Sequence, residues 1–302
     1  MAVGDLLVLR ALGLGDLLTG IPALRGLRRA RPGQRLVLAA PAALAPLAAL
    51  TGAVDAVLDQ PGLDRPLRTD GAPALAVNLH GRGPESTALL RATGSRELWA
   101  FDGDGPQWTD GGHEVDRWCR LLAFHGVAAD PGDLGLDRPA VAGPAPGAVV
   151  LHPGAASGSR RWPAERFAAV AAALLADGHR VVVTGGPSER DLAAAVAAAG
   201  AEAVGTDLTE LAALVADAAL VVCGDTGVAH LATAYGTPSV LLFGPTPPAE
   251  WGPRSGPHTV LWRGSGRGDP HGADPDPALL ALTVGEVLTA ARRLVRATAA
   301  SS

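Results

Sequence analysis

The stretch ALVVCGDTGVAHLATAYGTPSVLLF, residues 219–243, contains two short apolar runs separated by a polar turn and a helix-like segment. Each run is bounded by Gly or Pro, as expected of buried strands in a parallel sheet. The segment between them then begins at the carboxyl end of a strand, where the free N–H groups of a helix N-terminus bind anions. We expect Thr226 and Gly227 at that N-terminus and His230 one turn later. The alternative is that Asp225 only caps the helix and His230 is a buried polar residue.

Apolar runs and helical segments alternate along the whole chain, which predicts parallel sheets covered by helices. Strands are expected at residues 6–10, 35–39, 56–59, 74–79, 148–154, 179–187, near 203, 219–222 and 239–243. Helices are expected at residues 16–30, 42–50, 113–125, 163–178, 187–199, 207–218 and 283–297, and residues 252–282 are expected to form a loop.

The Pro-, Gly- and Ala-rich stretch at residues 137–148 interrupts this alternation and is the best candidate for a linker. A chain of 302 residues also suits two domains of ordinary size. We therefore predict an α/β protein with two Rossmann-like parallel-sheet domains facing a cleft. Residues 1–146 form the first domain, residues 147–282 the second, and residues 283–302 a final helix.

The composition excludes several classes of protein. Hydrophobic residues make up 48% of the chain and charged residues 18%, which is typical of a globular protein. A net charge of −5 argues against a nucleic-acid binder. The two cysteines indicate no disulfide framework, and no apolar run is long enough to predict a membrane-spanning helix. We infer a cytoplasmic protein. All 25 cationic side chains are Arg, so Arg can occupy positions where other proteins use Lys.

The segment RALGLGDLLTGIPAL, residues 10–24, directly follows the first predicted strand. It lacks the third glycine of a dinucleotide-binding fingerprint and the acidic residue about 20 positions later, so nicotinamide binding in this domain is not expected. What remains is a tight glycine turn that presents Asp16 at the carboxyl end of a strand. Asp16 is either a general base or a cap of the following helix, and the residues alone favour neither.

Two further loops follow predicted strands of the second domain. HPGAASGSRRWP, residues 152–163, has small residues that allow a ligand close to the backbone, and its Arg160 and Arg161 can reach an anion. TGGPSERD, residues 184–191, carries Glu189, which suits a ribose diol or favourably occupies a helix N-terminus. Together with the turn at residues 223–227, these loops predict a diphosphate site in which fixed N–H groups and Arg stabilise the leaving group without a divalent metal.

Four segments of the chain resemble glycosyltransferase family nine, the ADP-heptose:lipopolysaccharide heptosyltransferases. They are GLGDLLTGIPAL (13–24), HPGAASGSRRWP (152–163), VVVTGGPSERDL (181–192) and VVCGDTGVAHLATAYGTPSVLLFGPTPPAEWGP (221–253). The resemblance covers nearly the whole chain. It implies a GT-B fold with an N-terminal acceptor domain, a C-terminal nucleotide-sugar domain and a final helix that crosses back to the first domain.

The resemblance also implies an inverting, metal-independent sugar transfer in which Asp16 deprotonates the acceptor hydroxyl. Arg160 takes the place of a phosphate-binding Lys, and Glu189 matches the ribose-binding glutamate. The residues that match the donor-binding motif are Asp225, Thr226, Gly227 and His230. One departure is Ala155, which stands where the family has a hydroxylated residue. Further donor contacts are considered for His152, Ser157, Ser159 and Arg161, with Ser157 or Ser159 supplying the missing hydroxyl.

The acceptor side has fewer signals. VNLHGRG, residues 77–83, ends a first-domain strand and offers Asn78, His80 and Arg82 to an acceptor. Gly15, in the Asp16 turn, is a further candidate for acceptor binding. The basic segment at residues 25–35 either attracts anionic lipid head groups weakly or is a solvated helix end. In the loop at residues 263–282 a solvated loop is favoured over a metal site made of His271, Asp269 and Asp274.

We therefore expect a glycosyltransferase that moves a sugar, heptose being one candidate, from a nucleotide-diphosphate donor to a cell-envelope or other glycan acceptor. An ADP-sugar is the favoured donor, and neither a cofactor, a metal nor a nucleic-acid partner is expected. The protein is placed in the cytoplasm, with peripheral association at the inner face of the membrane as a further option. The alternatives are a sugar-nucleotide epimerase or hydrolase of the same fold and a non-catalytic nucleotide-sugar-binding protein.

Overall fold

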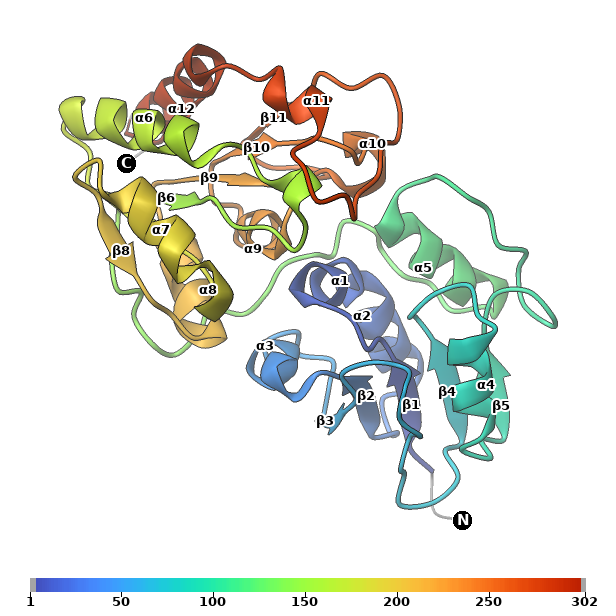
Figure 1. The fold of residues 1–302 in the computed structure, drawn as a ribbon. Helices are drawn as coiled ribbons and strands as arrows, with labels where there is room; N and C mark the ends of the chain where they lie inside the picture. The colour runs from blue at the N-terminus through green and yellow to red at the C-terminus, as the bar shows by residue number, and fades with distance from the viewer. Residues whose placement is uncertain (1–3, 300–302) are drawn as a thin grey trace. The chain divides into compact units, whose positions relative to one another are not determined.

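The protein is described here by a computed structural model covering residues 4–299, and side chains through residue 297. The chain divides into two compact units after Asp137 (Figure 1). This division falls at the beginning of the Pro- and Gly-rich linker, and the predicted domain boundary at residue 146 lies later in the same linker. Each unit contains one parallel sheet, as the alternating sequence pattern predicts.

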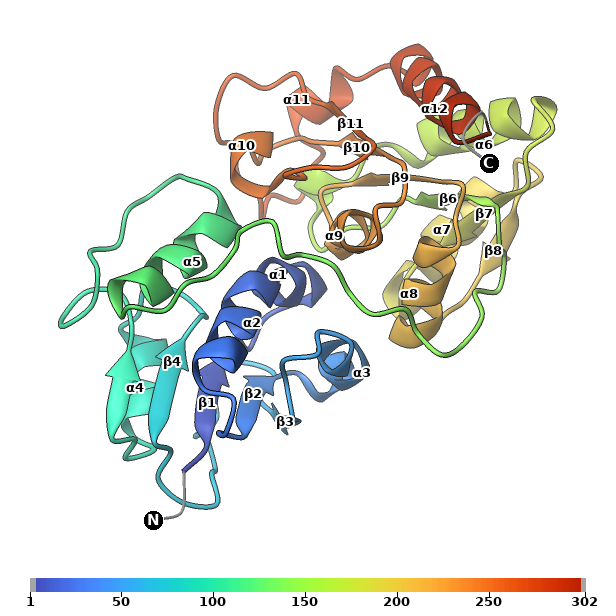
Figure 2. The same ribbon diagram turned by 180° about the vertical axis from the view of Figure 1, so that it is seen from behind.

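The first unit has a five-stranded sheet with the order β3-β2-β1-β4-β5, in which all neighbours are parallel. Its elements in chain order are β1 (Leu6–Leu9), α1 (Leu14–Thr19), α2 (Ile21–Ala30), β2 (Leu36–Ala40), η1 (Ala42–Leu44), α3 (Ala45–Ala49), β3 (Ala56–Asp59), β4 (Leu75–Asn78), α4 (Glu85–Arg91), β5 (Glu97–Trp99) and α5 (Glu114–Phe124). Leu9 pairs with Asn78, so the carboxyl ends of β1 and β4 lie side by side. Helices α2 and α5 pack together on one face of the sheet, and α4 packs on the other (Figures 1 and 2).

The second unit has a six-stranded parallel sheet with the order β11-β10-β9-β6-β7-β8. Its elements in chain order are β6 (Val149–His152), η2 (Gly158–Arg160), α6 (Ala164–Ala176), β7 (Val181–Thr184), η3 (Pro187–Glu189), α7 (Arg190–Ala197), β8 (Glu202–Val204), α8 (Leu208–Ala216), β9 (Leu220–Gly224), α9 (Gly227–Tyr235), β10 (Ser239–Leu242), α10 (Pro248–Trp251), β11 (His258–Leu261), α11 (Pro277–Leu280) and α12 (Val284–Ala299). The strands β6 and β9 are central neighbours. Their carboxyl ends therefore bring the 152–163 loop and the 223–227 turn to the same edge.

The core of the second unit lies between one face of the sheet and helices α6, α7 and α12. Alternate residues of β6 and β7, such as Leu151 and Val183, are fully buried on this face, while α8 and α9 cover the other (Figure 2). Helix α12 begins with a reciprocal cap in which Thr283 N donates to Glu286 Oε2 at 2.8 Å and Glu286 N donates to Thr283 Oγ1 at 3.3 Å. It packs against α6, β9 and β10 of its own unit. The expected crossing of this helix to the first unit stays a prediction.

The structure differs from the sequence pattern in three places. The predicted helix at residues 16–30 is two helices that meet at Gly20, where a Cβ atom would lie 3.1 Å from the Arg10 side chain. The predicted loop at residues 252–282 contains β11 and α11. The elements α4 and β5 were not anticipated, because a seven-residue helix and a three-residue strand are too short to show a clear periodicity.

Truncation of Leu151 tests the core of the second unit. Leu151 is fully buried in a central strand, so Leu151→Ala is expected to lower the free energy of unfolding by about 2–5 kcal/mol through lost burial and a cavity. The matched control is Leu280→Ala, because this side chain is 39% exposed, and its effect should stay within about 0.5 kcal/mol. Urea denaturation followed by circular dichroism measures both. Equal losses in the two variants would contradict the assignment of the core.

Candidate functional site

Asp16 lies in the first turn of α1, shortly after the carboxyl end of β1. Its Oδ2 atom accepts a hydrogen bond from Gly13 N at 3.2 Å, and its Oδ1 atom lies 3.7 Å from Arg10 Nη2. The side chain is 26% exposed. Burial raises the pKa of Asp16 above its ordinary value, Arg10 acts in the opposite direction, and Glu114 adds to the rise. Asp16 therefore caps the helix and still presents a carboxylate that can take up a proton.

Arg10 contacts both the carbonyl and the carboxylate of Asp16, and no role was predicted for it from the sequence. It follows β1 directly and is 1% exposed. Its Nε donates to the Asp16 carbonyl, its Nη1 to the Leu79 carbonyl, and its Nη2 to Thr19 Oγ1 at 3.0 Å. The Arg10 guanidinium thus joins the end of β1, the end of β4 and helix α1.

Glu114, in the first turn of α5, is the second site residue for which no role was predicted from the sequence. Its Oε1 accepts from Arg10 Nη2 at 3.3 Å and from Trp118 Nε1 at 2.8 Å, and its Oε2 accepts from Arg117 Nε at 3.1 Å. Arg10 also lies over the Trp118 ring, 4.9 Å from its centroid. A usable signal was present, because Glu114 and Trp118 are one turn apart on the apolar face of a helix. A carboxylate on that face requires a buried partner.

The four residues predicted to bind an acceptor lie in different environments. Asn78 is fully buried, and its amide donates to Ser86 Oγ at 2.9 Å and Thr87 Oγ1 at 3.0 Å. Its Oδ1 accepts from His80 N at 3.0 Å. All polar atoms of Asn78 therefore have partners within the protein, and its contact with an acceptor stays a prediction. The polar groups of Asn78 hold α4 against β4.

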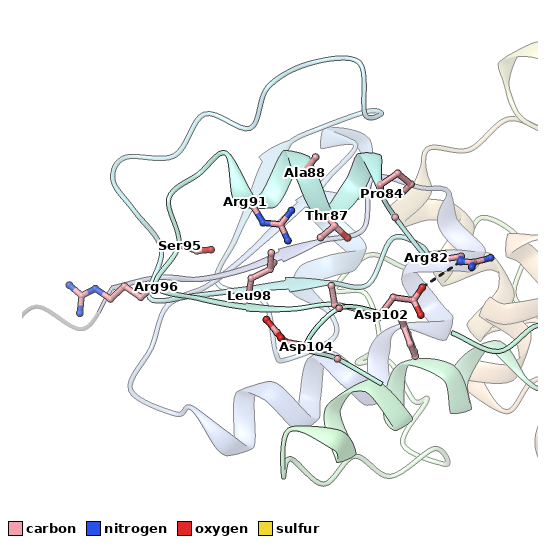
Figure 3. Close-up of a pocket in the computed structure, with 15 residues that line it drawn as sticks. Arg82, Pro84, Thr87, Ala88, Arg91, Ser95, Arg96, Leu98, Asp102 and Asp104 are labelled. Atoms are coloured by element: carbon pink, nitrogen blue, oxygen red, sulfur yellow. Dashed lines mark ion pairs between the residues drawn. The ribbon is translucent and has the colours of Figure 1, made fainter. Parts of the chain in front are cut away.

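His80 and Arg82 are more accessible than Asn78. Burial, followed by the charge of Arg10, lowers the pKa of His80, so its imidazole is neutral at pH 7. His80 Nδ1 is buried, and it has no hydrogen-bond partner among residues 4–299. Arg82 Nε lies 3.5 Å from Asp102 Oδ2. This ion pair lies at one end of a groove of about 630 Å³ between α4 and β5 (Figure 3). Gly15 lies within α1, and its carbonyl accepts from Thr19 Oγ1 at 3.1 Å.

In the second unit, the turn between β9 and α9 has the form that the sequence predicted. Thr226 is the N-cap residue and Gly227 is the first residue of the helix. The Thr226 hydroxyl is buried beside the Cys223 thiol and makes no conventional hydrogen bond within the described residues. Asp225 is 5% exposed. The turn therefore offers the N-terminal N–H groups of α9, which suit an anion.

His230 lies one turn into α9. Its ring is 6.0 Å from the Trp251 ring between centroids, in an edge-to-face arrangement. This contact links α9 to α10 and orients the imidazole.

Arg160 extends from the neighbouring loop to this turn. Its Nη1 donates to the Asp225 carbonyl at 3.4 Å and lies 4.0 Å from Asp225 Oδ2, while its Nε donates to Ser157 Oγ at 3.4 Å. The Arg160 side chain is 24% exposed. The structure thus brings together a cation and a helix N-terminus, as the sequence predicted for a diphosphate.

The other polar residues of the 152–163 loop serve to shape it. Arg161 donates from Nε at 3.0 Å and from Nη2 at 2.8 Å to the Ala155 carbonyl, which closes the loop on itself. Ser157 Oγ donates to the Pro270 carbonyl at 2.5 Å, and Ser159 is 3% exposed. The two serine hydroxyls are therefore engaged within the protein, and the structure gives Ser157 and Ser159 a role in holding the loop.

The segment at residues 268–276, whose role the sequence did not reveal, packs against this loop. Ser159 N donates to the Gly272 carbonyl at 2.9 Å, and Asp276 N donates to the Ser159 carbonyl at 3.1 Å. A Cβ atom on Gly158 would lie 1.5 Å from the Ala273 carbonyl oxygen. Such a close approach is open only to glycine, so residues 268–276 fix the backbone that carries Arg160.

Glu189 is anchored in the same manner as Asp16. Its Oε2 accepts from Gly186 N at 2.9 Å, and its carboxylate lies against Gly154, where a Cβ atom would come within 2.2 Å of it. His152 is 8% exposed and donates from Nδ1 to the Thr184 carbonyl at 3.1 Å. Burial lowers the pKa of His152, while Glu189 and the Thr184 carbonyl act in the opposite direction. The neutral imidazole of His152 thus contacts the first residue of the 184–191 loop, which carries Glu189.

The described residues contain no group of three or more His, Cys, Asp or Glu side chains that could hold a metal ion. In the 263–282 loop, Asp269 Oδ1 accepts from His271 N at 2.9 Å and so shapes the turn. Within residues 4–299, no helix combines the length and the apolar character that crossing a membrane requires.

The arginines around α2 have carboxylate partners within the first unit. The pairs are Arg25 and Arg29 with Asp133, Arg28 with Asp55, and Arg35 with Asp5. Arg31, the fifth cation of residues 25–35, lies over the Trp99 ring, 6.0 Å from its centroid. Three carboxylates therefore face five cations, and the predicted weak attraction to lipid head groups stays a prediction.

Two parallel-sheet α/β units with polar loops at the carboxyl edge of each sheet define a GT-B fold. The family model of glycosyltransferase family 9 (heptosyltransferase) matches residues 110–270, just over half of the chain. The protein belongs to this family.

Known proteins agree with this assignment. Lipopolysaccharide heptosyltransferase 3 of Escherichia coli is 36% identical over 127 residues, which are 39% of this chain and 37% of that protein. A family 9 glycosyltransferase from Veillonella parvula superposes with a TM-score of 0.79 at 20% identity, covering 98% of each chain. The structure of E. coli ADP-heptose LPS heptosyltransferase II gives a TM-score of 0.77 at 19% identity, covering 97% of this chain and 99% of that one.

A methyl group on Gly158 tests the contact with residues 268–276. Gly158→Ala places its Cβ against the fixed Ala273 carbonyl, so we expect a loss of about 1–3 kcal/mol in stability from the forced backbone shift. The matched control is Gly205→Ala, because a Cβ atom there meets nothing within 4 Å. Thermal unfolding of the two variants measures the difference. A Gly158→Ala protein as stable as the control would show that the contact is not maintained in solution.

Proposed function

We propose that this protein is an inverting, metal-independent glycosyltransferase. It transfers a sugar from a nucleotide-diphosphate donor, with ADP-heptose favoured, to a cell-envelope or other glycan acceptor. The observation that carries the proposal is the meeting of Arg160 with the N-terminus of α9 at the carboxyl edge of a parallel sheet. Membership of family 9 supports the reaction class, and the donor named for the E. coli structure supports an ADP-sugar.

The donor contacts are assigned from the chemistry of each group. The diphosphate lies against the N–H groups of Gly227 and the following residue, the Thr226 hydroxyl and the Arg160 guanidinium, all of which favour negative charge. Glu189 accepts hydrogen bonds from the ribose hydroxyls, since only one of its oxygens is used by Gly186 N. Asp225 and His230 contact the sugar side of the donor.

The chemical step begins with the acceptor hydroxyl, whose proton moves to the Asp16 carboxylate. The hydroxyl oxygen attacks the anomeric carbon while the bond from that carbon to the diphosphate breaks on the opposite face, which inverts the configuration. The nucleoside diphosphate leaves with the bonding electron pair, and Arg160 and the N-terminus of α9 stabilise its charge without a metal ion. The protein acts in the cytoplasm, and neither a cofactor nor nucleic acid takes part.

A nucleotide titration tests the donor site. With EDTA present, ADP and ADP-heptose at 100 times their dissociation constants are expected to stabilise the protein by about 2.7 kcal/mol. GDP, UDP and dTDP at the same concentration as ADP should stabilise it less. Glu189→Gln should weaken this effect, because a neutral amide is a poorer acceptor for a diol. Glu165→Gln, on the exposed surface of α6, is the control. If no nucleotide stabilises the protein, the donor site is refuted; stabilisation only after Fe²⁺ or Mg²⁺ addition would refute metal independence.

Replacement of Asp16 tests the base. Asp16→Asn keeps an oxygen for Gly13 N but cannot accept the proton, so sugar transfer should fall by about 10²–10⁴-fold while nucleotide stabilisation is retained. The control is Asp64→Asn at an exposed position of the first unit. Chromatography of products from ADP-heptose, with and without acceptor glycans, measures the reaction. Transfer at the wild-type rate would rule out the base role, and products formed equally well without acceptor would favour a hydrolase or epimerase.

A further inference from the structure

We propose that Glu114 is a positioning residue: by sharing the buried Arg10 guanidinium with Asp16, it keeps the Asp16 carboxylate free to accept a proton. The inference rests on the proposed function, because it assumes that Asp16 takes the acceptor proton. Glu114 lies 98 positions from Asp16 in the sequence, on a different element of the first unit, and it touches Asp16 only through Arg10.

The Arg10 guanidinium lies between the two carboxylates and is closer to Glu114. Arg10 Nη2 lies 3.3 Å from Glu114 Oε1 and 3.7 Å from Asp16 Oδ1, so the nearer carboxylate is not the one that would react. The guanidinium cannot turn towards Asp16, because its Nε and Nη1 atoms donate to the carbonyls of Asp16 and Leu79. The division of the charge between the two acids is therefore fixed by the fold.

Glu114 itself is held in place. Donors reach it from three sides, namely Arg10, Trp118 and Arg117. Arg117 is in turn fixed by the carbonyls of Thr109 and Gly111, at 2.9 and 3.3 Å. These three donors hold the Glu114 carboxylate, which is only 11% exposed, in place beside Arg10.

The charges of Arg10 and Glu114 act on the pKa of Asp16 in opposite directions. A carboxylate that alone faced a buried cation would bind a proton poorly, because the ion pair favours its charged form. The described groups that face Asp16 and Arg10 are Glu114 and Arg117 on α5 and His80 after β4, and His80 is neutral because burial lowers its pKa. Burial raises the pKa of Asp16, Arg10 opposes this rise and Glu114 supports it. The negative charge of Glu114 thus offsets the effect of Arg10.

The test is Glu114→Gln in the full chain, with two readouts. The first is the acid side of the pH profile of kcat, which follows deprotonation of the base. The second is the pH titration of the Asp16 carboxyl carbon by NMR with ¹³C-labelled aspartate, assigned with Asp16→Asn. The full charge of Arg10 then acts on Asp16, so both are expected to move to lower pH by about one unit. The plateau of kcat should fall a few-fold, because a weaker base accepts the proton less readily.

Matched variants separate charge from shape. Glu114→Asp keeps the charge and should leave the Asp16 titration close to wild type, whereas Glu85→Gln, on the surface of α4, should change nothing. If Glu114→Gln does not fold, Trp118→Phe replaces it. This variant keeps an aromatic ring at position 118 but removes the indole N–H that donates to Glu114 Oε1. More of the Glu114 charge then acts on Arg10, so the Asp16 titration should move to higher pH.

An Asp16 titration that does not move in Glu114→Gln, or in Trp118→Phe if that variant is needed, overturns the inference. So does an equal shift in Glu114→Gln and Glu114→Asp. The titration needs no enzymatic turnover, so it tests Glu114 even if the proposed transfer reaction is absent. Conversely, a normal transfer rate in Asp16→Asn would refute the base role while the titration still reported the charge coupling.

Discussion

Burial of the Arg10 guanidinium is the constraint on which the arrangement of the first unit's site depends. Removing such a charge from water costs several kcal/mol unless charge partners and hydrogen-bond acceptors replace the solvent. Those partners come from the end of β4, from α1 and from α5. The three segments must therefore meet around the end of β1. The same side chain packs against the junction of α1 and α2, where a Cβ atom on Gly20 would lie 3.1 Å from it.

The two candidate carboxylates of the units, Asp16 and Glu189, are presented by the same local device. Each follows a glycine by three residues, and one oxygen of each accepts the N–H group of that glycine. This hydrogen bond fixes the rotamer and leaves the second oxygen available. The surroundings then separate their roles. Asp16 lies beside a buried cation, whereas Glu189 lies against Gly154, where the absence of a side chain makes room for the carboxylate.

Most of the fold was predictable from the sequence, because buried strands and amphipathic helices leave periodic patterns. The parallel sheets and the β9–α9 turn with Thr226 at the helix N-terminus were predicted and are observed. Short elements such as α4, β5 and β11 were not, since few residues give little periodicity. Arg10 and Glu114 were missed for another reason. Their meaning comes from a contact between residues 104 positions apart, which no local pattern displays. The site assignments of the second unit rest on motifs, and they stay predictions.

The adjacent arginines of the 152–163 loop show why residue type alone could not assign roles. Arg161 uses Nε and Nη2 on a single carbonyl of its own loop, so its planar fork closes the chain. Arg160 uses Nε and Nη1 on Ser157 and Asp225, and its Nη2 makes no hydrogen bond within the described residues. A guanidinium held at two of its three nitrogens has lost most of its rotational freedom before any ligand arrives. Binding an anion at the third nitrogen then costs less conformational entropy than ordering a free lysine would. The replacement of the family's lysine by Arg160 is therefore compatible with phosphate binding because Ser157, itself fixed by Pro270, holds the longer side chain in place.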